Sequence, residues 1–152
     1  MAHQEAAQRV KEQFAVGDYA ALQAPTGWAK STAFMEELQK VLRVMIVILQ
    51  PRRIAARSLA QRVKAGGYII GGENKTAKST KLIYVTGGIP QKMVAQWPPG
   101  GVLAIDEVRI EAEYIDAAFA CVPAILARGG KLLVLSACIP GRITTLRFGA
   151  IS

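Results

Sequence analysis

Short apolar runs alternate with longer amphipathic segments along the chain. The runs are apolar at successive positions, as expected of strands that are covered by helices on both faces. They predict six strands, over residues 19–23, 44–49, 68–70, 81–86, 102–105 and 131–136. This alternation predicts an α/β fold with a mostly parallel sheet and helices on both faces.

The segments between these runs carry apolar residues at helical spacing. A helix over residues 53–64 is predicted from a stripe formed by Ala55, Leu59 and Val63, and a helix over 113–127 from Ile115, Phe119, Val122 and Leu126. Residues 1–15 predict a lead-in helix that Gly17 and Asp18 connect to the first strand. Polar residues 74–80 and the Trp-Pro-Pro-Gly-Gly segment 97–101 predict loops within a single domain, 1–152.

Composition narrows the possible partners. The chain has 152 residues, of which 51% are hydrophobic and 20% charged, enough to bury one compact core. Nineteen Lys and Arg against eleven Asp and Glu give a net charge of +8. This charge favours an anionic partner, although a solubilising surface would produce the same balance.

Several chemistries are excluded by the residues at hand. Cys121 and Cys138 stand singly in apolar segments, which predicts reduced core cysteines. His3 is the one histidine, and we expect it on a frayed terminus, which argues against a Ser-His-Asp triad or a His-ligated zinc. The apolar runs are far shorter than the roughly 20 residues of a membrane span. We therefore expect a soluble intracellular protein, in the cytoplasm, with no membrane span.

A phosphate loop is predicted between the first strand and the first long helix. Residues 24–32 read Ala-Pro-Thr-Gly-Trp-Ala-Lys-Ser-Thr, at the place and with the pattern of a GxxxxGK[ST] loop. In such a loop backbone N–H groups surround phosphate oxygens, a lysine meets the β/γ charge, and the next hydroxyl holds Mg²⁺. The candidate residues for ATP, or another NTP, are Pro25, Thr26, Gly27, Trp28, Ala29, Lys30, Ser31 and Thr32. The alternative is an ordinary strand-to-helix turn capped by a serine.

The loop departs from the pattern at both glycine positions. Ala24 and Ala29 stand there, and the bulky Trp28 precedes Ala29. A Cβ at a position built for unusual backbone angles costs on the order of 1–3 kcal/mol, or roughly 5- to 150-fold in nucleotide affinity. We therefore expect nucleotide binding that is weakened at Ala29.

Two carboxylates follow the strand predicted over 102–105. Asp106 and Glu107 would lie at the carboxyl end of that strand, where ligands bind in α/β sheets. An aspartate at this place can complete the Mg²⁺ shell with Ser31, and the adjacent glutamate can polarise an attacking water. Glu107 and Lys30 are thus the candidate catalytic residues.

Five segments together resemble a known family. They are residues 24–32, then 50–57 (Gln-Pro-Arg-Arg-Ile-Ala-Ala-Arg), 84–88 (Tyr-Val-Thr-Gly-Gly), 105–108 (Ile-Asp-Glu-Val) and 135–140 (Leu-Ser-Ala-Cys-Ile-Pro). In order and spacing they are similar to motifs I, Ia, Ib, II and III of superfamily 2 helicases of the DEAH and viral NS3-like group. The resemblance implies the first RecA-like lobe of an ATP-driven translocase that acts most often on RNA.

The resemblance also implies roles for further residues. Pro51, Arg52, Arg53, Thr86 and Gly87 would grip the backbone of a nucleic acid, for which single-stranded RNA is expected. The alternative for the arginines is a solvated start of a helix. A coupling element between nucleotide state and strand movement is implied at Arg109, Ser136, Ala137 and Cys138.

Two functions remain open at this stage. The first is the NTP-binding lobe of an ATP-dependent RNA helicase, coupling hydrolysis to strand movement. The second is a hydrolysis-defective lobe that serves as an RNA-binding or protein-docking module, because Ala29, Arg109 and Cys138 depart from the family pattern. An altered or truncated form of a working enzyme would show the same departures.

The resemblance further implies a second RecA-like lobe, normally in the same polypeptide. No arginine-finger motif follows Cys138, so we expect no second lobe within these 152 residues. The isolated chain is therefore expected to show negligible unwinding and very low ATPase activity.

Overall fold

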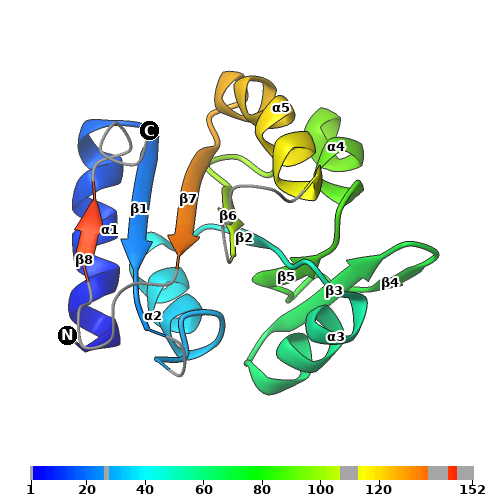
Figure 1. Cartoon of the computed structure of the whole chain (residues 1–152), viewed down its shortest axis with the longest axis horizontal. Helices are drawn as coiled ribbons and strands as arrows, with labels where there is room; N and C mark the ends of the chain where they lie inside the picture. The colour runs from blue at the N-terminus through cyan, green and yellow to red at the C-terminus, as the bar shows by residue number, and fades with distance from the viewer. Residues whose placement is uncertain (1, 26–27, 107–112, 137–143, 147–152) are drawn as a thin grey trace.

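The computed structural model describes residues 2–25, 28–106, 113–136 and 144–146 (Figure 1). The helices are α1 (His3–Val16), α2 (Ala33–Leu42), α3 (Arg53–Arg62), α4 (Ile89–Met93), the 3-10 helix η1 (Val94–Gln96) and α5 (Glu113–Ala127). The strands are β1 (Tyr19–Gln23), β2 (Ile46–Leu49), β3 (Gly66–Ile70), β4 (Glu73–Lys75), β5 (Leu82–Val85), β6 (Val102–Ile105), β7 (Lys131–Ser136) and β8 (Thr144–Leu146).

The described strands form one sheet in the order β4-β3-β5-β2-β6-β7-β1-β8. The central strands pair in parallel with their neighbours. At the two edges of the sheet, β4 pairs antiparallel with β3 and β8 pairs antiparallel with β1. The carboxyl ends of β1, β2, β5, β6 and β7 therefore lie along one edge of the sheet. Loops that leave this edge can meet at a single site.

Helices cover both faces of the sheet, and each face has its own core. Alternate residues of β2 show the division, because Ile46 and Ile48 pack with α1, α2 and α3, whereas Val47 and Leu49 pack with α4 and α5. All four residues of β2 are fully buried, because helices cover the strand on both faces. The predicted α/β class with a mostly parallel, two-face-covered sheet is confirmed.

Most of the predicted elements are present, with shifted ends. All six predicted strands occur, and the lead-in helix spans His3–Val16. The prediction of a loop over 74–80 was wrong at its start, because β4 forms there by pairing with β3. The short elements α4, η1 and β8 were not predicted.

The predicted buried stripe of α3 is confirmed in part. Val63 is buried and Leu59 packs on the core, but Ala56 and Ala60, rather than Ala55, are the buried positions within the helix, which ends at Arg62. These small side chains let α3 approach the sheet closely. A Cβ at Gly66, where β3 starts, would lie 2.4 Å from the Ala60 carbonyl oxygen, so this approach requires glycine there.

Candidate functional site

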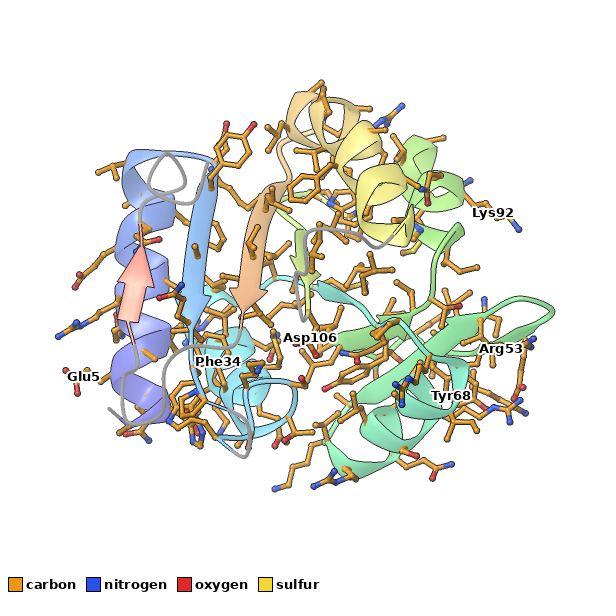
Figure 2. The ribbon with its side chains drawn as sticks, viewed as in Figure 1. Glu5, Phe34, Arg53, Tyr68, Lys92 and Asp106 are labelled. Carbon is orange, nitrogen blue, oxygen red and sulfur yellow. The ribbon has the colours of Figure 1, made fainter. Side chains whose placement is uncertain are left out.

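The predicted site residues meet at the carboxyl edge of the sheet. The phosphate loop follows β1, Gln50 follows β2, Thr86 follows β5 and Asp106 follows β6. Because these strands are parallel and close together in the sheet, segments far apart in sequence converge. Figure 2 shows Asp106 near the middle of the molecule, where the ends of the strands lie.

Asp106 joins the phosphate loop to the sheet. Its side chain is 2% exposed. Oδ2 accepts hydrogen bonds from Ser31 Oγ and, at 2.7 Å, from Gln50 Nε2. The structure thus brings Ser31 and Asp106, the two residues predicted to hold Mg²⁺, into direct contact across 75 residues of sequence. Hydroxyl and carboxylate oxygens are the hard ligands that Mg²⁺ prefers, so this pair fits that ion.

Tyr84 holds the same serine from another side. Its hydroxyl donates a hydrogen bond to the Ser31 carbonyl, and its ring is fully buried in the core beneath α2. Burial, together with the nearby carboxylates of Glu36 and Asp106, raises the pKa of Tyr84 far above its ordinary value. This shift favours the protonated phenol, which donates the hydrogen bond to Ser31.

Gln50 and Tyr84 belong to segments that resemble family motifs, but neither was predicted as a site residue. The signal that identified Asp106, a polar residue directly after a buried strand, also applies to Gln50. Tyr84 carried no such signal, because its position inside an apolar run predicts only a core residue.

The described part of the phosphate loop turns sharply into α2. The Trp28 N–H donates to the Pro25 carbonyl at 3.2 Å, and the Ala29 carbonyl accepts from the Thr32 and Phe34 N–H groups at 3.3 and 3.1 Å. Lys30 is 8% exposed, so its aliphatic stem is buried at this edge. Thr26 and Gly27 lie outside the described residues.

Ala29 adopts the left-handed backbone conformation, with φ of +61°. This angle favours glycine, which confirms the expectation that the position is built for unusual backbone angles. The side chain is exposed and faces no packing constraint that would explain an alanine. The strain at Ala29 is thus local to the backbone.

We expect Ala29→Gly to raise the free energy of unfolding by about 0.5–1 kcal/mol, because relief of left-handed strain exceeds the added entropy of the unfolded glycine chain. Urea denaturation would measure it. Ala65→Gly is the matched control, because Ala65 has φ of +56° outside the phosphate loop. Both variants should stabilise the chain, but only Ala29→Gly should tighten nucleotide binding. Equal affinity in the two would show that Ala29 does not weaken the loop.

The predicted nucleic-acid residues, 51–53 and 86–87, lie directly after two neighbouring strands, and we call this surface the shelf. Residues 51–53 follow β2 and residues 86–87 follow β5, and these strands pair in parallel with Leu49 opposite Val85. Residues 51–53 and Gly87 are exposed, whereas Thr86 is buried. The Arg53 guanidinium donates to the Gly71 carbonyl at 2.8 Å, which fixes it over the β3–β4 turn (Figure 2). The structure therefore brings both predicted segments together.

A charged cluster beside this shelf ties α3 to the β3–β4 hairpin. The Arg57 guanidinium pairs with Glu73 at 2.5 Å, and the Tyr68 hydroxyl donates to the other Glu73 oxygen. These hydrogen bonds, from Tyr68 first and then Arg57, lower the pKa of Glu73, while Glu73 raises the pKa values of Tyr68 and Arg57. Arg57 is thus committed to an internal contact.

This cluster predicts a pH dependence of the hairpin. Because the folded pKa of Glu73 is depressed, its contribution to stability is present above the ordinary pKa of about 4.3 and is lost as pH falls through the folded value. Carbon NMR titration of the Glu73 carboxyl would report it. Tyr68→Phe should raise this pKa most, and Arg57→Ala should raise it less. An unchanged pKa in both variants would contradict the assignment.

Several predicted residues lie outside what the structure describes. Glu107, Arg109, Ala137 and Cys138 fall in undescribed segments, and Ser136 is described only as the last residue of β7. Cys121 is buried and free in α5, as predicted. Within the described ranges no cluster of three potential metal ligands occurs, and no helix is long and apolar enough to cross a membrane.

The expectation for His3 was wrong. His3 is the first residue of α1, is half-buried, and contacts the phosphate loop at Trp28. Its distance of 25 residues from Trp28 left no local pattern by which the sequence could indicate this contact.

The sheet order, the phosphate loop after β1 and the carboxylate after β6 define a RecA-like P-loop domain. No protein-family model matches the chain. Sequence relatives include the ATP-dependent RNA helicase HrpB of Escherichia coli, 33% identical over 133 residues, covering 76% of this chain and 16% of HrpB. Another is YLR419W of Saccharomyces cerevisiae, provisionally named an ATP-dependent RNA helicase, 29% identical over 136 residues and covering 75% of this chain and 10% of that protein.

Solved structures with a similar fold are also helicases. Crystal structures of E. coli HrpB, described as a DEAH/RHA helicase and as a DExH-box NTPase, superpose with TM-scores of 0.79 and 0.76 at 26% identity. Each match covers 93% of this chain and 20% of HrpB. The chain is therefore similar in sequence and in fold to DEAH/RHA-type helicases, and it corresponds to one RecA-like lobe. It spans less than a fifth of the length of the curated relatives above.

Proposed function

We propose that the chain is the NTP-binding lobe of an ATP-dependent RNA helicase and that it binds Mg²⁺-ATP, or another Mg²⁺-NTP, at the carboxyl edge of the sheet. The observation that carries this proposal is the contact of Ser31 with Asp106, which Gln50 braces at 2.7 Å. It joins the phosphate loop to the strand-end carboxylate beside the buried stem of Lys30.

Each residue has a role that its position supports. The Lys30 ammonium would neutralise charge on the β- and γ-phosphates, while backbone N–H groups of the loop after Pro25, that of Ala29 among them, would surround them. Ser31 Oγ and the Asp106 carboxylate would hold Mg²⁺, which would neutralise charge on the phosphate oxygens. Gln50 orients the carboxylate, and Tyr84 holds the backbone of Ser31. Glu107, directly after Asp106, would polarise the attacking water.

The exposed shelf would receive the nucleic acid. Pro51, Arg52, Arg53 and Gly87 would contact the phosphates of single-stranded RNA, with Thr86 anchoring the turn after β5. Arg109, Ser136, Ala137 and Cys138 would couple this grip to the nucleotide state. A second RecA-like lobe, in the same polypeptide, would close over the nucleotide.

A hydrolysis-defective lobe that docks RNA or protein is the alternative function. The left-handed Ala29 supports it, because a Cβ at this position hinders close phosphate approach. The two functions differ in their dependence on nucleotide, because the helicase lobe would bind Mg²⁺-NTP through Lys30, whereas the docking module would bind RNA or a protein equally well with Lys30 replaced.

A Mg²⁺-dependent titration separates these functions. Tryptophan fluorescence of the Trp97→Phe variant, in which Trp28 remains as reporter, would follow a non-hydrolysable ATP analogue with Mg²⁺ and with EDTA. Circular dichroism would first confirm that this variant folds, because it loses the hydrogen bond from Trp97 to Gly101. Adenosine serves as the control without phosphates. A saturable response that needs both Mg²⁺ and phosphates supports the helicase lobe, and no response at millimolar analogue contradicts it.

A further inference from the structure

The side chain of His3, the first residue of the lead-in helix, contacts the phosphate loop. His3 Nε2 lies 2.5 Å from the Trp28 carbonyl oxygen, and the two rings pack at 4.4 Å between centroids with a 50° tilt. A carbonyl oxygen can only accept, so Nε2 carries the hydrogen. Both the Nε2-protonated neutral ring and the imidazolium supply this donor. The contact therefore holds the peptide group between Trp28 and Ala29.

Trp28 is also held from its other side. Its ring packs on the fully buried Phe34 of α2 at 5.5 Å, with a tilt of 37°. The loop side chain is thus placed between the first residue of α1 and the first turn of α2, against the core of this face. Trp28 therefore packs the loop against both helices.

These contacts fix both peptide groups that flank the left-handed Ala29. The preceding carbonyl, of Trp28, is bonded to His3, and the carbonyl of Ala29 itself accepts from the N–H groups of Thr32 and Phe34. In a trans peptide the C=O and N–H point in opposite directions. Because His3 draws the Trp28 carbonyl toward α1, the Ala29 N–H points away from α1.

We propose that His3 is a positioning residue of the phosphate loop. It orients the Trp28–Ala29 peptide group so that the Ala29 N–H faces the nucleotide phosphates beside Lys30 and Ser31. This role rests on the proposed nucleotide binding. It gives the lead-in helix a part in ligand binding, and it maintains a backbone angle that alanine disfavours.

The test compares His3→Ala, His3→Gln and Gln4→Ala in titrations with the Mg²⁺-ATP analogue, well below the melting temperature. Gln places an amide donor near the position of Nε2, and Gln4 is an exposed neighbour in the same turn. Loss of one hydrogen bond predicts about three- to tenfold weaker binding in His3→Ala. His3→Gln should restore most of the affinity, whereas Gln4→Ala should match the wild type. Wild-type affinity in His3→Ala overturns the proposal.

A second readout needs no nucleotide. A hydrogen bond at the Trp28 carbonyl polarises the following amide, so the nitrogen chemical shift of Ala29 should move upfield in His3→Ala and return in His3→Gln. If the wild-type chain binds no nucleotide, the proposed function fails, and this shift alone decides whether His3 positions the peptide. An unchanged Ala29 shift overturns the positioning role in either case.

Discussion

Replacing Lys30 with alanine should weaken binding of the Mg²⁺-ATP analogue by about 10- to 150-fold, the range for a lost hydrogen bond to a charged group. Lys30 follows directly on the strained Ala29, and its stem is buried, which restricts the side chain before ligand arrives. This preorganisation makes the charge more effective than a mobile surface lysine. Isothermal titration calorimetry at constant ionic strength would measure the change.

Lys40→Ala is the matched control for this experiment. Lys40 lies on α2, is exposed, and pairs with Glu37 at 3.3 Å. The control removes the same unit of positive charge from the same region of the chain, so it also tests whether general electrostatic attraction explains the binding. Equal losses in Lys30→Ala and Lys40→Ala would refute a specific role of Lys30.

The sequence predicted the central strands because burial on both faces leaves an uninterrupted apolar run. Ile46–Leu49 and Leu82–Val85 show this plainly, since all their residues are buried. The edge strands β4 and β8 have three residues each and depend on pairing with β3 and β1, which local pattern does not encode. Glu73–Lys75 in particular is polar throughout, so its sequence is typical of a loop.

The site likewise contains contacts that the sequence predicts and contacts that it does not. Ser31 and Asp106 could be predicted to meet, because each follows a strand of one parallel sheet at its carboxyl end. His3 and Tyr84 act on backbone carbonyls of the loop, and a carbonyl acceptor is present at every position of the chain. Only the three-dimensional fold identifies which carbonyl such a side chain reaches.

The departure from the family pattern at Ala29 has a structural counterpart in its neighbour Trp28. The left-handed angle at Ala29 is disfavoured by its Cβ, while the contacts of Trp28 with His3 and Phe34 hold the loop in that angle. The two neighbouring side chains are therefore opposite in their effect on this backbone angle. Restoring glycine at residue 29 should make the loop less dependent on the His3 contact.

Replacing Asp106 with alanine should have the largest effect on stability among these variants. The change leaves the buried Gln50 amide and the Ser31 hydroxyl without their shared acceptor, at about 1–3 kcal/mol for an unsatisfied buried group. Relief of the desolvated carboxylate offsets part of this loss, so we expect the free energy of unfolding to fall by about 2 kcal/mol. Urea denaturation at neutral pH would measure it.

Asp106→Asn separates folding from metal binding. Ser31 and Gln50 both donate to Oδ2, so the single carbonyl oxygen of asparagine can accept from both and preserve the fold. The amide lacks the negative charge that Mg²⁺ requires, so the difference between titrations with Mg²⁺ and with EDTA should disappear. Retention of Mg²⁺ dependence in a folded Asp106→Asn chain would show that Asp106 does not hold the metal, and would move the ligand role to another carboxylate.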